Sequence, residues 1–165
     1  MSNTSRILWL GFVVATCALP LTAKAQGSAH TSSPGLVGSW HLDSWTLGDG
    51  TPRCSEEEGG ASGIIAYTSD GHMSAQLGCA DVDTSDLSSL SPQAAAGALS
   101  RRHFSYYGRY TLDLSAQTVT HHVEGSSSVP FVGSDQVREF VFEGPDRLVL
   151  SPAGSSQLLV WLRNH

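Results

Sequence analysis

Basic residues are scarce in this chain of 165 residues, and lysine is almost absent. Lys24 is the only lysine, and lysine and arginine together number nine against fifteen aspartates and glutamates. The sequence has no basic run, the feature with which proteins bind nucleic acids and anionic membrane surfaces. The part of the chain after Lys24 also has no lysine amine for Schiff-base chemistry. The composition therefore excludes catalysis by lysine and argues against nucleic acid as a partner.

Several motifs that mark enzymes and metal sites are missing as well. The sequence has no Gly-x-Ser-x-Gly elbow, no phosphate-binding glycine loop and no dinucleotide fingerprint. It has no Cys-x-x-Cys or His-x-x-x-His spacing, and His121 and His122 point to opposite faces if they lie on one strand. We therefore expect no metal and no cofactor, and these absences weigh against an enzyme without excluding one.

Apolar runs long enough to cross a membrane are lacking, and the apolar stretch near the N-terminus is short. Arg6 precedes the apolar residues 7–15, and Ala23-Lys24-Ala25 has the small-x-small pattern of a signal peptidase site. We predict a signal peptide over residues 1–25 and a secreted or periplasmic protein without stable membrane insertion. The alternatives are a retained anchor and a lipoprotein modified at Cys17.

Cleavage after Ala25 changes the charge balance, because it removes Arg6 and Lys24 but no acidic residue. Seven basic and fifteen acidic residues then remain, which is a net charge of −8. Residues 26–35 are rich in glycine, serine, threonine and proline and predict a flexible lead-in. Residues 36–165 have the length of one domain and contain no internal repeat.

Cys54 and Cys79 are the cysteines that remain after cleavage. An even number of cysteines in an oxidising compartment indicates a disulfide. Asp70-Gly71 predicts a two-residue hairpin turn, and in that register Cys79 lies opposite Ser62. The glycine-rich loop 58–61 lets Cys54 fold back to reach it. Two free thiols, a redox pair and a metal-binding pair are the alternatives.

Alternating apolar and polar residues predict strands along most of the domain. Arg138, Phe140 and Phe142, for example, share one face of a predicted strand. Short connections such as Ser115-Ala116 and Gly144-Pro145 are typical of hairpin turns. The predicted strands cover residues 37–47, 62–69, 72–78, 105–114, 117–124, 135–143, 146–152 and 156–164.

One helix interrupts this series of strands. Ser91 is a predicted N-cap, Pro92 fits the first helical position, and residues 93–99 continue the helix. Eight strands with short links and one inserted helix predict an all-β, eight-stranded antiparallel up-and-down barrel, whose closure removes exposed edges. Such a barrel has room for its own side chains or for one small ligand. A two-sheet sandwich is the alternative.

Gly38-Ser39-Trp40, at the start of the first predicted strand, resembles the Gly-x-Trp signature of lipocalins. In lipocalins this tryptophan closes the barrel floor and packs against an arginine late in the chain. Arg163, which follows Trp161 in the last predicted strand, is the candidate for that arginine. Further segments resemble, in the expected order, the lipocalin-like domain family of bacteria and fungi. They are residues 65–77, 106–110, 119–126, 132–138 and 146–150.

The resemblance covers about residues 36–163 and implies a lipocalin-like barrel around a small cavity. It implies no single activity, because the wider lipocalin group spans carriers and enzymes. Two features depart from the family pattern. Cys54 and Cys79 stand where the family usually has other residues, which suits an exported member, and residues 126–130 are unusually rich in serine.

Polar side chains within the predicted strands are the candidate ligand-binding residues. His121 shares its strand face with valines, so we expect His121 rather than His122 to point into the barrel. Arg138 shares its face with phenylalanines and needs a partner there, such as Glu124, a tyrosine or a ligand carboxylate. The predicted cavity residues are Tyr67, Tyr107, Tyr110, His121, Glu124, Gln136, Arg138 and Phe140.

We favour a protein that holds a small apolar or amphipathic molecule in the barrel, with Arg138, His121 and a tyrosine at its polar end. The second interpretation is an isomerase or cyclase that uses the same pocket, with His121 as acid or base and Arg138 as anion anchor. The third is a structural barrel filled by its own side chains, in which Arg138, Glu124 and Gln136 only join neighbouring strands.

Cleavage of the signal peptide is directly testable. Protein recovered from the secreted or periplasmic fraction is expected to begin at Gln26, because signal peptidase cuts after the small-x-small pattern. N-terminal sequencing and the intact mass measure this. A lipid-modified Cys17 as first residue, or an uncut N-terminus, would contradict the prediction.

Overall fold

The structure is a computed structural model that describes residues 35–81, 85 and 87–165. The predicted signal peptide and all but the last residue of the predicted lead-in lie outside these residues, as does the acidic and serine-rich stretch around residues 82–84. The eight predicted strands are present, and their ends lie within about two residues of the predicted ones. The strands are β1 (Gly38–Thr46), β2 (Ala61–Tyr67), β3 (His72–Cys79), β4 (Phe104–Asp113), β5 (Thr118–Ser126), β6 (Asp135–Phe142), β7 (Arg147–Pro152) and β8 (Leu158–Arg163).

The strands pair antiparallel in the order of the chain and close into a barrel. Closure comes from β1, which pairs on one side with β2, where Gly38 faces Tyr67, and on the other side with β8, where Trp40 faces Arg163. Each strand therefore has two neighbours, and no long row of unpaired backbone groups is left at an edge. The predicted eight-stranded up-and-down barrel is confirmed, and the sandwich alternative is wrong.

The register of the β2–β3 hairpin differs by one residue from the prediction. Cys79 lies opposite Ala61 rather than Ser62. The turn is longer than two residues, because the Thr68 amide donates to the His72 carbonyl at 2.9 Å and the Gly71 amide donates to the Thr68 carbonyl at 3.2 Å. Gly71 has a φ of 87°, which completes a three-residue loop of the type that ends on a left-handed glycine.

One end of the barrel is closed by Trp40 and Arg163. The Arg163 guanidinium lies 4.0 Å from the centre of the fully buried Trp40 ring, and its Nη1 donates to the Val37 carbonyl at 3.1 Å. Gly38 has a φ of +134°, and a Cβ there would come within 2.9 Å of Arg163. The contact implied by the Gly-x-Trp resemblance is present, and it explains why glycine precedes the tryptophan.

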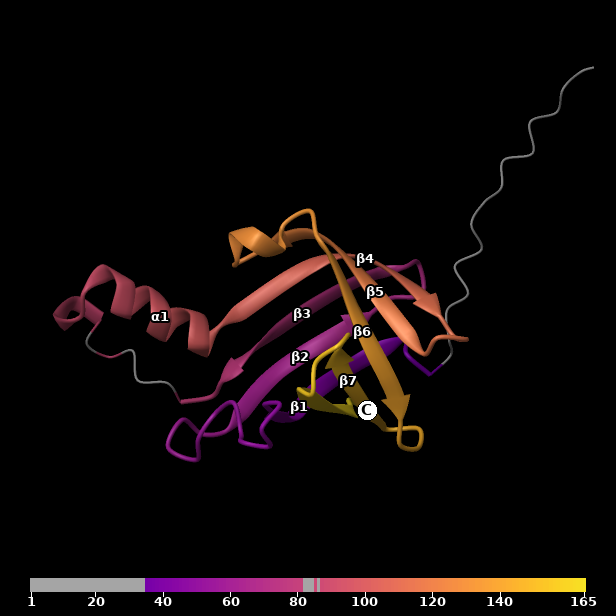
Figure 1. Cartoon of the computed structure of the whole chain (residues 1–165), viewed down its shortest axis with the longest axis horizontal. Coiled ribbons are helices and arrows are strands. Elements are labelled where there is room, and N and C mark those ends of the chain that lie inside the picture. Colours follow the sequence, from indigo (N-terminus) through magenta and orange to yellow (C-terminus); the bar gives the residue numbers. More distant parts are fainter. Residues whose placement is uncertain (1–34, 82–84, 86) are drawn as a thin grey trace, which may run out of the picture.

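Two short helices and one longer helix complete the described chain, namely η1 (Leu87–Ser89), η2 (Val129–Phe131) and α1 (Pro92–Arg102). The predicted start of α1 is confirmed, because the Ser91 hydroxyl accepts a hydrogen bond from the Ala94 amide at 3.3 Å. No residue of α1 is buried, and the helix projects away from the barrel, leaving only its last turn near the strands (Figure 1).

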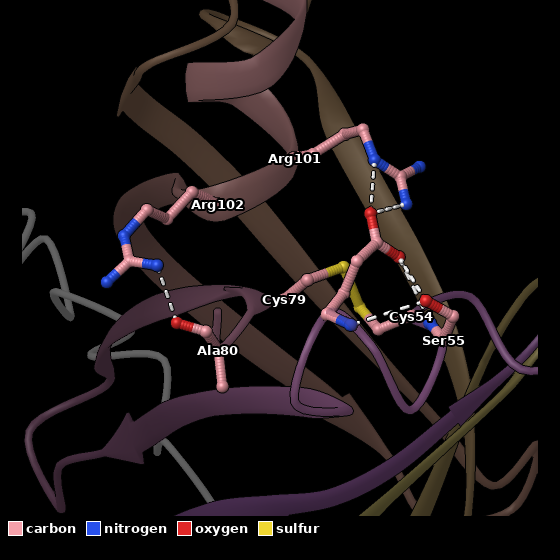
Figure 2. Close-up of a disulfide and its surroundings, with 7 residues drawn as sticks. Cys54, Ser55, Cys79, Ala80, Arg101 and Arg102 are labelled. Atoms are coloured by element: carbon pink, nitrogen blue, oxygen red, sulfur yellow. Dashed lines mark hydrogen bonds and ion pairs between the residues drawn. A yellow bond between two sulfur atoms is a disulfide. The ribbon is translucent and has the colours of Figure 1, made fainter. Parts of the chain in front are cut away.

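The long β1–β2 connection is tied to the barrel at two points (Figure 2). Cys54 and Cys79 form the predicted disulfide, which joins this connection to the end of β3. Next to it, Glu58 accepts hydrogen bonds from the Arg101 side chain at the end of α1, with Nε at 3.0 Å. The other carboxylate oxygen of Glu58 accepts the Ser55 amide at 3.0 Å. These contacts hold a loop and a helix end together at the end of the barrel opposite Trp40.

Removal of the disulfide is expected to lower stability. The double variant Cys54→Ser/Cys79→Ser loses a cross-link across a sequence separation of 25, which corresponds to about 3.5 kcal/mol of unfolding free energy in the chain-entropy model. Urea unfolding of the mature protein measures this difference. Reductant is expected to destabilise the wild-type protein to a similar extent and to leave the variant unchanged. A variant as stable as the wild-type protein would contradict the prediction.

Candidate functional site

A cavity of about 460 Å³ lies at the open end of the barrel. The β1–β2 connection, the last turn of α1, the η2 segment and the β7–β8 turn all contribute to its lining. These segments gather at the same end of the barrel in Figure 1. Trp40 and Arg163 lie at the opposite end of the barrel and do not line the cavity.

Most of the cavity wall is apolar. Inward-facing residues of β2, β3, β7 and β8 form it together with aromatic rings from β4 and η2, as expected where alternate residues of each strand point inward. The Phe104 and Phe131 rings contact each other edge to face at 4.9 Å and stand beside Tyr106. The main apolar lining residues are Ile65, Ala75, Leu77, Phe104, Tyr106, Phe131, Leu150, Leu159 and Trp161.

The polar part of the lining is rich in arginine. Arg53, Arg101 and Arg138 all line the cavity, together with Gln136 and Gln157. Among the described residues that line it, none is an aspartate or a glutamate. The cavity wall therefore has positive charge in a chain whose net charge is −6.

The three arginine side chains make different kinds of contact. Arg101 is paired with Glu58, and this interaction holds the pKa of the Glu58 carboxyl below its usual value. Arg53 lies over the Trp45 ring, with its guanidinium carbon 5.5 Å from the ring centre. Arg138 donates to the Val137 carbonyl at 3.0 Å and to the side-chain oxygen of its neighbour Gln136 at 3.3 Å.

Trp161 contributes a polar group without a partner. Its side chain lines the cavity and is only 1% exposed. Within the described part of the chain, its Nε1–H is a buried donor that meets no acceptor. Buried donors of this kind cost free energy unless an acceptor is supplied from elsewhere.

Three polar side chains that are joined by hydrogen bonds lie beneath the cavity. The His121 ring is fully buried, with its Nε2 2.8 Å from the Tyr67 hydroxyl and its Nδ1 3.0 Å from the Tyr106 hydroxyl. Since Tyr106 also lines the cavity, it connects the buried histidine to the cavity wall. The three side chains come from β2, β4 and β5, and they pin these strands together through the barrel interior.

Burial determines the charge state of His121 and its two tyrosine partners. Loss of solvation, together with the positive charge of Arg138, lowers the pKa of His121 to about 3. Burial also raises the pKa of both tyrosine hydroxyls, which Arg138 partly opposes at Tyr106. At neutral pH the imidazole is therefore uncharged, with one ring nitrogen donating and the other accepting.

The structure brings some of the predicted cavity residues together. Gln136 and Arg138 line the cavity from β6. His121 points into the barrel as expected, and Tyr67 lies beside it in the layer below the cavity. His122 lies on the outer face, where its Nδ1 is 2.7 Å from Asp135.

Two predicted cavity residues lie on the outside of the barrel, which corrects their placement. Tyr107 is 58% exposed. It packs over Gly125, where an added Cβ would come within 2.5 Å of its ring. Glu124 is exposed and is the extra residue of an irregular pairing, in which Tyr107 faces Gly125 but Gly108 faces Val123. Glu124 therefore does not neutralise Arg138 inside the barrel.

Two other predicted residues are buried but do not line the cavity. Tyr110 packs edge to face on Tyr67 at 5.1 Å, and its hydroxyl donates to the Thr68 carbonyl at 2.8 Å. Phe140 belongs to the hydrophobic core beside Phe142. Both residues serve packing in the barrel, and neither offers a polar group to the cavity.

Sequence reasoning missed Tyr106 as a cavity residue, although a signal was available. Tyr106 and Tyr110 are separated by an even number of positions, so strand alternation places both on the face opposite Tyr107. Arg53 and Arg101 lie in a loop and at a helix end, and no periodicity in the sequence predicts that they meet. The disulfide next to Arg53 and the Glu58 ion pair on Arg101 bring them to the cavity.

The described residues contain no helix that is long and apolar enough to span a membrane. No group of three or more histidine, cysteine, aspartate or glutamate side chains is positioned to hold a metal ion in the part of the chain that the structure describes.

The fold and the site define a closed up-and-down β-barrel with a cavity at one end. The profile of the lipocalin-like domain family matches residues 37–160, and the chain belongs to this family. A redesigned β-barrel is 14% identical with a TM-score of 0.41, over 79% of this chain and 92% of that one. A DUF4847 family protein from Bacteroides vulgatus ATCC 8482 is 12% identical with a TM-score of 0.45, over 79% and 95%. No protein with a curated description matches the chain.

The low pKa of His121 predicts a loss of stability in acid. In the unfolded chain a histidine binds a proton near pH 6.5, whereas in the folded protein His121 stays neutral down to about pH 3. Between these values the unfolded state binds more protons, so the free energy of unfolding falls as the pH falls. From pH 6.5 to pH 5 the contribution of His121 is about 2 kcal/mol.

Urea unfolding of the wild-type protein and His121→Gln at pH 7 and pH 5 measures this contribution. The variant is expected to be less stable at pH 7, and its deficit is expected to shrink by about 2 kcal/mol at pH 5. His103→Gln, at an exposed position, is the control and should follow the wild-type pH dependence. If His121→Gln is less stable than the wild-type protein by the same amount at pH 7 and pH 5, His121 has the same pKa in the folded and unfolded protein, and the prediction is wrong.

Proposed function

We propose that this protein binds a small apolar or amphipathic molecule in the cavity at the open end of its barrel. The observation that carries the proposal is a cavity of about 460 Å³ with an apolar wall and a few polar groups. Sites for small molecules have this size and composition. Barrels of eight strands in lipocalins hold one small ligand in this position.

The same cavity argues against a barrel that is filled by its own side chains. A filled barrel has few voids larger than a water molecule. The proposed strand-joining network of Arg138, Glu124 and Gln136 also loses support, because Glu124 lies on the outside. Of the three, only Gln136 and Arg138 contact each other.

The isomerase or cyclase alternative has no suitable acid or base at His121. The imidazole is fully buried, both ring nitrogens are engaged by tyrosine hydroxyls, and its pKa is about 3. A general acid or base works best with a pKa near the operating pH and needs to reach the substrate. We therefore favour binding over catalysis.

We also propose that the protein acts outside the cytoplasm, as a secreted or periplasmic protein. The disulfide between Cys54 and Cys79 is compatible with such a location, because oxidising compartments preserve disulfides. The predicted signal peptide over residues 1–25 supports the same proposal from the sequence.

Native mass spectrometry of the mature protein, purified from its own compartment without denaturation, tests the binding proposal. A small molecule that stays bound and is released only on unfolding is the expected result. An empty barrel that also shows no thermal shift with lipids, aromatic compounds and isoprenoids would contradict the proposal and favour a structural role.

A variant that fills the cavity provides a second test. Ala75 lines the cavity and is 1% exposed, so Ala75→Leu places three further carbon atoms in the ligand space. Ligand affinity is expected to fall roughly tenfold or more while the barrel stays folded. Ser74→Leu adds a similar apolar group on the outer face of the same strand and is the matched control. Equal ligand retention in both variants would place the ligand elsewhere.

A further inference from the structure

The cavity collects positive charge in a chain that has little of it. Seven arginines follow Ala25, and three of them line this one cavity. Outside the cavity, Arg147 and Arg163 have carboxylate partners: the Arg147 Nε lies 2.6 Å from Glu143, and the Arg163 Nε lies 3.5 Å from Asp146. Among the described residues that line the cavity, by contrast, the charged side chains are all arginines.

Arg138 lies in the cavity wall without a negatively charged partner among the described residues. It is half-buried, and its hydrogen bonds go to a backbone carbonyl, a glutamine oxygen and the Tyr106 hydroxyl, all of which are neutral. Within the described residues no carboxylate contacts it. A charge that is partly removed from water without a counter-charge is unfavourable, and an anion brought by a ligand removes that penalty.

Of the other two arginines that line the cavity, one is paired with a carboxylate and one is not. Arg53 stacks on Trp45, which orients the guanidinium but leaves its charge in place. Arg101 is neutralised by Glu58, and this ion pair joins the end of α1 to the β1–β2 connection at the open end of the barrel, which forms the rim of the cavity. The lining thus keeps two uncompensated cations, Arg53 towards the rim and Arg138 on the β6 wall.

Trp161 leaves a second polar group near the cavity without a partner. Its Nε1–H is buried and has no acceptor among the described residues, although the indole lines the cavity. An indole N–H is a donor only, so it stays unsatisfied until an acceptor oxygen comes within reach. Arg138 lacks a counter-charge and Trp161 lacks an acceptor, and both side chains line the same cavity.

We infer that the ligand is an anionic amphiphile, with a carboxylate bound by Arg138 and an apolar body against the wall formed by Leu150, Leu159 and Trp161. A guanidinium presents two parallel N–H groups, which match the two oxygens of a carboxylate. The inference rests on the proposed cavity binding and adds the chemical class of the ligand to it.

Matched probes test this assignment. Isothermal titration of the mature protein with decanoate, 1-decanol and decylamine compares one apolar body with an anionic, a neutral and a cationic end. The aromatic pair 2-naphthoate and 2-naphthalenemethanol repeats the comparison with a different body. The carboxylates are expected to bind roughly tenfold or more tightly than the alcohols, because a carboxylate brings a full negative charge and two acceptor oxygens to the guanidinium, whereas a hydroxyl brings one neutral acceptor. Decylamine is expected to bind most weakly.

Arg138→Met tests the residue, because methionine keeps an unbranched side chain and removes the charge. The variant is expected to bind carboxylate and alcohol equally, with the affinity for alcohol and the thermal midpoint close to wild type. Arg109→Met removes the same charge from an exposed site on β4 outside the cavity and should keep the preference. Arg138→Lys keeps the charge without the paired N–H groups and should restore part of the preference.

The outcomes separate this inference from the proposed function. If the alcohols bind as tightly as the carboxylates and Arg138→Met changes neither, the anionic ligand is wrong and cavity binding stands. If no probe binds and native mass spectrometry finds an empty barrel, both proposals fail. If decyl phosphate binds far more tightly than decanoate through Arg138, the ligand is a phosphate ester and the carboxylate assignment is wrong.

Discussion

The packing of Arg163 on Trp40 closes one end of this barrel. It joins the last strand to the first, at the point where closure brings the two ends of the sheet together. The guanidinium also satisfies the Val37 carbonyl at the entry to β1. Because Gly38 has no side chain, the arginine can approach the backbone closely there. This packing seals one end of the barrel, and the cavity lies towards the other.

The open end is organised by different forces. A disulfide and an ion pair tie the β1–β2 connection to β3 and to α1, whose residues are otherwise not buried. Arg53 stands next to the disulfide-bonded Cys54 in sequence, so the cross-link also limits where its charge can lie. A disulfide and an ion pair thus hold the β1–β2 connection and the end of α1 in place, because α1 buries no residue against the barrel.

Between the two ends, His121 lies in the barrel interior beneath the cavity. Its two tyrosine partners satisfy both ring nitrogens, which is the condition for burying an imidazole. The same burial removes its proton at neutral pH and makes it a poor acid or base. The positive charge that acts on the cavity therefore comes from arginine, which stays charged at any pH of biological interest.

The strands, their order, the helix start and the pairing of the cysteines could be predicted from the sequence. The sequence also favoured His121 over His122 as the inward-facing histidine, without deciding between them. Those features follow from local alternation, capping and a count of two cysteines, all of which can be read along the chain. The positions of Glu124 and Cys79 were harder, since an irregular pairing and a three-residue turn each shift the pairing by one residue.

Gln136 and Arg138 were predicted to line the cavity, but the other polar groups that join them there could be found only in the folded structure. Arg53, Arg101, Arg138 and Trp161 come from a loop, a helix end and two strands, and no sequence period relates them. Their convergence depends on the closure of the barrel and on the cross-links at its rim. Contacts between distant segments are set by that closure, and for this reason the cavity and its charge appear only in the folded chain.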